Sequence, residues 1–67
     1  MTTQDKRDVA SLEAYLDEIG PGSVVSETGV SLDTLVPESF VAAWLRGSDR
    51  VRTYPTLRGS QRWELIN

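Results

Sequence analysis

Apolar side chains recur at helical spacing in the first third of the chain. Between residues 5 and 19 they follow one another at intervals of three and four, at Val9, Leu12, Leu16 and Ile19. Such spacing places them on one face of a helix. Asp5 can cap the start of this helix, and Gly20-Pro21-Gly22 ends it because proline and glycine cannot continue a helical pattern. We therefore predict a first helix from Asp5 to Ile19.

The next segment, Ser23 to Ser26, contains two adjacent valines. Valine favours a strand, although the same residues could open a short helix, and we favour the strand. Gly29 tolerates a positive φ, so residues 27–31 are interpreted as a turn. Ser31 can then cap a short helix from Leu32 to Leu35.

A third helix is predicted from Pro37 to about Arg46, because proline suits a first helical turn and Gly47 supplies a stop. Its apolar face is formed by Phe40, Val41, Trp44 and Leu45. We expect Trp44 to be a core anchor. The outward side then carries Glu38, Ser39, Ala42, Ala43 and Arg46.

The last segment is typical of a β-hairpin, with strands at Arg50–Tyr54 and Arg62–Ile66 around a turn at residues 55–60. In the second strand Trp63 and Leu65 alternate with charged residues, the pattern of a half-buried strand. In the first strand the same alternation places Val51 and Thr53 on one face. The other face would carry Arg50, Arg52 and Tyr54.

The predicted elements make an α+β fold. Length and composition indicate one domain spanning residues 1–67, since 39% of the residues are hydrophobic and 25% are charged. The chain has no cysteine and no histidine, which excludes disulfides, thiolate chemistry, zinc fingers and imidazole catalysis. No spacing resembles a phosphate loop or a metal-carboxylate cluster. We therefore expect no enzyme activity, no cofactor and no metal. Without a long apolar run or a leader-like start, the chain is expected to be cytoplasmic and to make no membrane contact.

Charge is divided unevenly along a chain of net charge -3. Residues 1–45 hold eight carboxylates against two cations, whereas residues 46–67 hold five arginines against two carboxylates. These arginines are Arg46, Arg50, Arg52, Arg58 and Arg62. A cationic hairpin beside a helical body can bind a phosphate backbone. Each of the four hairpin arginines, which are Arg50, Arg52, Arg58 and Arg62, could equally be a solvated strand residue, or a partner of Asp49 or Glu64.

The order of helix, short strand, two helices and hairpin resembles a winged helix-turn-helix domain, with three helices followed by a C-terminal β-hairpin wing. Locally, Val24-Val25-Ser26-Glu27-Thr28-Gly29-Val30-Ser31-Leu32-Asp33-Thr34-Leu35 resembles a helix-turn-helix core. The ending Gly59-Ser60-Gln61-Arg62-Trp63-Glu64-Leu65-Ile66 resembles the return strand of a wing. Pro37 would interrupt a recognition helix in the first register, so we place that helix at residues 37–46.

The resemblance implies a small DNA-binding transcriptional regulator of a prokaryote or a virus. The third helix would enter the major groove and present Ser39 and Arg46 to bases. The wing would contact phosphates through Arg50, Arg52, Arg58 and Arg62. Tight binding would need a homodimer on a pseudo-palindromic site, for which Tyr15 and Tyr54 are candidate contacts. The alternative is a protein-interaction module or viral modulator of a host protein that uses the acidic helical surface.

Overall fold

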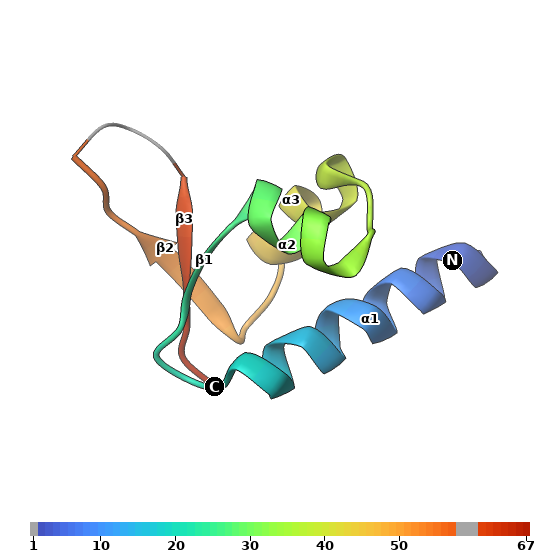
Figure 1. The fold of residues 1–67 in the computed structure, drawn as a ribbon, viewed down its shortest axis with the longest axis horizontal. Coiled ribbons are helices and arrows are strands. Elements are labelled where there is room, and N and C mark those ends of the chain that lie inside the picture. Colours follow the sequence, from blue (N-terminus) through green and yellow to red (C-terminus); the bar gives the residue numbers. More distant parts are fainter. Residues whose placement is uncertain (1, 58–60) are drawn as a thin grey trace.

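The computed structural model describes residues 2–57 and 61–67, which form three helices and a three-stranded antiparallel sheet (Figure 1). Along the chain these elements are α1 (Thr3–Ile19), β1 (Val24–Ser26), α2 (Glu27–Thr34), α3 (Glu38–Arg46), β2 (Val51–Tyr54) and β3 (Arg62–Leu65). The α+β class and the order of the elements are as the sequence predicts. The pairing of the first strand with the hairpin was not predicted.

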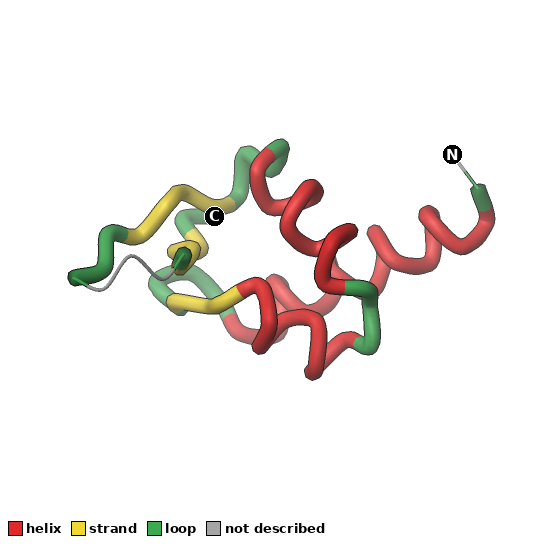
Figure 2. The backbone as a smooth tube through the Cα atoms, turned by 90° about the horizontal axis from the view of Figure 1, so that it is seen from above, coloured by secondary structure: helices red, strands yellow, loops and turns green. Residues whose placement is uncertain are grey.

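The sheet has the strand order β1-β3-β2, so the last strand lies between the other two. Trp63 stands opposite Val25 on one side and Thr53 on the other, and Leu65 stands opposite Val51. Partners that stand opposite one another in an antiparallel pair share a face. Trp63 and Leu65 are buried, so this face is the inner one. In Figure 2, α3 and β2 run along one side of the molecule, and β1 and α2 run along the other.

The core draws buried side chains from the three helices, from β2 and β3, and from the connection between α2 and α3, and Val25 of β1 packs against it half-buried. Its buried members are Leu12, Leu16, Val30, Val36, Val41, Leu45, Val51, Trp63 and Leu65. Trp44 packs against this core but is only half-buried. The burial of Trp44 is therefore less than the sequence analysis predicted. Val41 and Leu45 occupy the centre of the apolar face of α3, and Phe40 and Trp44 form its flank. Trp63 is the buried tryptophan.

Helix α1 begins two residues before the predicted start, and Thr2 rather than Asp5 is its cap. The Thr2 hydroxyl accepts a hydrogen bond from the Asp5 amide at 3.1 Å, and the Asp5 carboxylate accepts one from the Thr2 amide at 3.4 Å. This reciprocal arrangement satisfies two backbone donors at once, which explains why the earlier start is preferred. One turn further on, Asp8 is buried and accepts a hydrogen bond from Gln4 at 2.9 Å.

The prediction of a turn at residues 27–31 is wrong, because α2 already begins at Glu27. Ser26 caps it by accepting a hydrogen bond from the Gly29 amide at 3.0 Å. Ser31 lies inside the helix, where its hydroxyl donates to the Val36 carbonyl at 2.6 Å. The sequence offers two serines that can cap a helix, and the one at the end of β1 is used.

Helix α2 ends at Thr34 and is capped by Leu35, a residue in the left-handed conformation with φ 62° and ψ 23°. Its amide donates to the Ser31 carbonyl at 2.8 Å, which satisfies one carbonyl of the last turn. Glycine is the usual residue at such a position, since a Cβ atom there costs roughly 1–2 kcal/mol. The Leu35 side chain is 89% exposed, so it gains little from burial within the chain.

Replacing Leu35 with glycine is therefore expected to raise the free energy of unfolding by about 1 kcal/mol, because it removes the strain of the left-handed conformation. Leu32→Gly is the matched control, since it removes the same side chain from an exposed position inside the helix. There glycine should lower the free energy of unfolding by about 1 kcal/mol. Urea unfolding followed by circular dichroism measures both. A loss of stability in both variants would contradict this account of Leu35.

Candidate nucleic-acid interface

Two helices joined by a short connection form the first part of the candidate interface. Residues 35–37 link α2 to α3. Among them, Val36 is buried in the core and Pro37 is the N-cap of α3. Ser39 and Arg46 are exposed, as the sequence predicts. Together with the exposed Ala43 they follow spacings of four and three, so they lie on one side of α3. This side of the helix is accessible, and its small middle residue leaves room for close approach.

The outer face of the sheet forms the second part. In the pairing of β2 with β3, Arg52 stands opposite Glu64 and Tyr54 stands opposite Arg62. Both arginines therefore share the face that the predicted alternation assigned to Arg52 and Tyr54, while Val51 is buried as expected. Arg62 is exposed and forms no ion pair with any residue that the structure describes. Its guanidinium is available to an anion.

Arg52 is partly committed to the sheet itself. Its Nε and Nη2 atoms donate to Oε1 of Glu64 at 2.9 and 2.8 Å, which confirms one of the pairings that the sequence left open. The Arg52 side chain remains 65% exposed. A guanidinium has further N–H donors on Nη1, so Arg52 can still contact an anion while Glu64 fixes its orientation.

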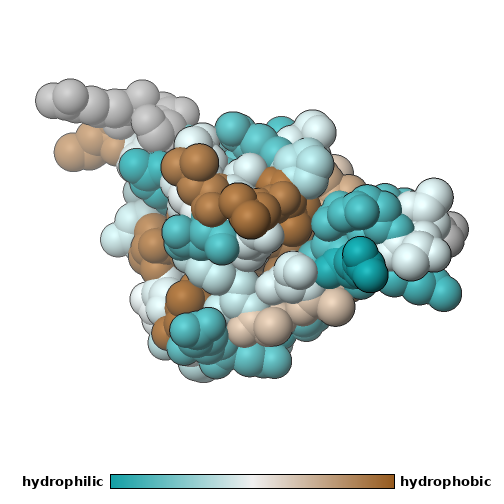
Figure 3. All heavy atoms as spheres, turned by 45° about the vertical axis from the view of Figure 1, so that its right-hand side comes forward, coloured by the Kyte–Doolittle hydropathy of each residue, from teal (hydrophilic) through white to brown (hydrophobic). Residues whose placement is uncertain are grey.

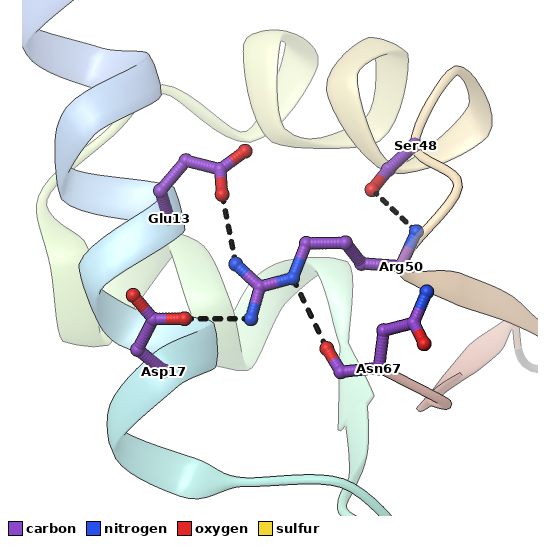
Figure 4. A network of polar contacts seen from close by, with 5 residues as sticks. All are labelled: Glu13, Asp17, Ser48, Arg50 and Asn67. Carbon is purple, nitrogen blue, oxygen red and sulfur yellow. Dashed lines mark hydrogen bonds and ion pairs between the residues drawn. The ribbon is translucent and has the colours of Figure 1, made fainter.

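Arg50 lies just before β2 and turns its guanidinium toward α1 (Figure 4). Nη1 contacts Glu13 Oε2 at 2.8 Å, Nη2 contacts Asp17 Oδ1 at 2.7 Å, and Nε donates to the Asn67 carbonyl at 3.1 Å. The side chain is 24% exposed. Hydrogen bonds to Asp17 and then to Glu13 raise the pKa of Arg50 above its ordinary value. Arg50 therefore joins the sheet to α1.

The sequence had grouped Arg50 with Arg52 as an anion-binding arginine. The sequence did not reveal its partners, because Glu13 lies 37 residues and Asp17 lies 33 residues before Arg50. Only folding brings these two carboxylates to the guanidinium. The spacing of four between these two carboxylates, on one face of α1, is the signal that could have indicated a shared cationic partner. The predicted contact Arg58 lies outside the described residues.

Tyr15 links α1 to α2, because its hydroxyl donates to Asp33 Oδ2 at 2.8 Å. The pKa of Tyr15 is raised above its usual value of 10.0. Partial burial is the larger cause, and the hydrogen bond to Asp33 is the second. Tyr15 stays a predicted dimer contact, although its hydroxyl already has a partner within the chain. Tyr54, the other candidate, is 43% exposed on the outer face of the sheet.

Comparison with family models, with curated proteins and with solved structures finds no match to this chain. Within residues 2–57 and 61–67, no three acidic side chains gather into a group that could hold a metal ion. In the same residues, none of the helices has both the length and the apolar character that crossing a membrane requires. Function is therefore inferred from the arrangement of the chain's own residues.

The raised pKa of Tyr15 predicts a loss of stability at alkaline pH. The folded chain holds the phenol proton more tightly than the unfolded chain, whose pKa is about 10. The associated stability is complete below that unfolded pKa and is lost as pH rises through the folded pKa. Tyr15→Phe should therefore unfold at a lower urea concentration than the wild type near pH 8, and the gap should narrow above about pH 10.

Tyr54→Phe serves as the control, because it removes a phenol from the outer face of the sheet and leaves the bond between Tyr15 and Asp33 intact. It should keep the alkaline loss of the wild-type chain. Urea midpoints measured between about pH 7 and pH 11 test both variants. A constant gap between Tyr15→Phe and wild type across this range would contradict a stabilising phenol proton.

Proposed function

We propose that this chain is a winged helix-turn-helix domain that binds double-stranded DNA as a small transcriptional regulator. The observation that carries the proposal is the placement of two accessible surfaces in succession. The outward side of α3, with Ser39 and Arg46, leads directly into the hairpin whose outer face carries Arg52 and Arg62. In Figure 2, α3 and β2 follow one another along the same side of the molecule.

In this proposal α3 enters the major groove. Arg46 reads guanine, because a guanidinium can donate to O6 and N7 of that base together, and Ser39 makes a less selective contact. Ala43 lies between them and allows the helix to approach the base edges. The carboxylate of Glu38 opposes phosphate at the first turn of α3, although Thr28 donates a hydrogen bond to it at 3.1 Å. Among the described residues on this side of α3, Arg46 is the one strong base-reading side chain.

The hairpin supplies the backbone contacts. Arg62 offers a guanidinium that forms no ion pair with residues 2–57 or 61–67, and Arg52 offers the donors that Glu64 does not use. Arg58, which the sequence places at the turn of the hairpin, remains a proposed contact. Two to three phosphate contacts give weak, salt-sensitive binding, since each neutralised phosphate contributes roughly 0.9 to the salt slope. Tight and selective binding therefore needs a homodimer on two half-sites.

Removing the two hairpin arginines tests the proposal. The Arg52→Ala/Arg62→Ala variant should bind all duplexes more weakly, and its salt slope should fall by about 2 because two phosphate contacts are lost. Arg46→Ala should instead change the preference among sequences by roughly 1–3 kcal/mol. Fluorescence anisotropy with mixed-sequence duplexes at increasing salt measures both effects.

Arg7→Ala is the matched control, since Arg7 is an exposed arginine near the start of α1, at the opposite end of the molecule from the hairpin (Figure 1). It removes one charge and should leave the salt slope unchanged. Circular dichroism confirms that each variant is folded. An unchanged slope in the double variant, or an equal fall in the Arg7 control, would contradict a phosphate-binding hairpin.

A further inference from the structure

A stripe of exposed side chains runs along α2 on a surface that the DNA-binding proposal does not use. Thr28, Leu32 and Leu35 follow spacings of four and three, and we call them the leucine stripe. Leu32 is 72% exposed and Leu35 is 89% exposed. Figure 3 shows apolar atoms gathered in the upper middle of the face that it presents, beside the polar start of α1. Adjacent exposed apolar side chains of this kind mark interaction surfaces.

The end of the leucine stripe is held in place by the fold. The Leu35 amide donates a hydrogen bond to the Ser31 carbonyl. The next residue, Val36, is buried, and its carbonyl accepts a hydrogen bond from the Ser31 hydroxyl. The Thr34 hydroxyl donates to the Val30 carbonyl at 2.7 Å. Leu35 is thus fixed in a disfavoured conformation with its side chain in solvent. The fold gains nothing from a leucine there that glycine would not supply.

Carboxylates lie at two places beside the leucine stripe. At its first residue, the Thr28 hydroxyl donates a hydrogen bond to the carboxylate of Glu38. Next to Leu32 in the sequence, Asp33 lines an open hollow of about 280 Å³ between α1 and α2. Its lining includes Glu18 and Asp33, and none of its lining residues is a cation. The surface therefore combines exposed leucines with carboxylates at Glu38 and in the hollow.

We propose that the leucine stripe docks a cationic segment of a partner protein. Apolar side chains of that segment cover Leu32 and Leu35, in the manner of an amphipathic helix laid on an apolar surface. A lysine or arginine of the same segment enters the hollow beside Glu18 and Asp33. The charges favour this occupant over a second copy of the chain, because a two-fold contact would bring the same carboxylates together across the interface. Phosphates of DNA would be repelled in the same way.

The test uses the whole chain and a model ligand, an amphipathic helical peptide of leucine and lysine. In an NMR titration, this peptide should shift the amides of Leu32, Asp33 and Leu35. The same peptide with glutamate in place of lysine should cause no shifts at these amides. Leu32→Ser/Leu35→Gly should weaken binding of the lysine peptide at least about tenfold, which corresponds to 1.4 kcal/mol.

Leu57→Gly is the matched control, since Leu57 is a fully exposed leucine at the far end of the hairpin. This variant should bind the lysine peptide as the wild type does. Binding that survives the loss of both stripe leucines, or that falls equally in the control, would overturn the proposal. So would sedimentation showing that the wild-type chain self-associates and that the stripe variant does not, because the occupant would then be a second copy.

Discussion

The fold depends on the pairing of β3 along both of its edges. Glu64 stands opposite Val24 on one side and opposite Arg52 on the other, and β1 and β2 do not pair with each other. The turn after α1 is joined to the same strand, because the Leu65 amide donates to the Ser23 carbonyl at 2.8 Å and the Leu65 carbonyl accepts from the Gly22 amide at 2.7 Å. A strand from the first half of the chain and two strands from its last third thus complete one sheet, and the inner side chains of β3 close the core.

This arrangement divides the arginines of the last third of the chain between two tasks. Arg50 lies where the sheet meets α1, and all three nitrogen positions of its guanidinium donate to acceptors within the chain. Arg52 and Arg62 point to the opposite face of the sheet from the core, and Arg46 lies at the exposed end of α3. Because Glu13 and Asp17 neutralise Arg50, the positive charge that the accessible surface presents is smaller than the count of arginines in residues 46–67 suggests. The proposed binding to DNA is therefore expected to be weak for a single copy.

Periodicity predicted what depends on neighbouring residues: the stripe of α1, the limits of α3 and the alternation of the hairpin. It failed where two local signals compete, since both Ser26 and Ser31 can cap a helix and only the position of β1 decides between them. It also failed where distant residues meet. The pairing of β1 with β3, the ion pairs of Arg50 and the burial of Trp63 deeper than Trp44 follow from tertiary packing. The left-handed Leu35 contradicts residue preference, so no sequence rule predicts it.

The central claim is that Arg50 stabilises the fold by joining the sheet to α1, whereas the guanidinium groups of Arg52 and Arg62 are accessible to an anion on the outer face of the sheet. Arg50→Gln tests it most directly, with thermal unfolding and the salt dependence of duplex binding measured on the same folded sample. The account predicts a lower unfolding temperature, because Glu13 and Asp17 lose their shared cation, and an unchanged salt slope. A salt slope reduced by about 1 with an unchanged unfolding temperature would contradict it, because Arg50 would then be a phosphate contact.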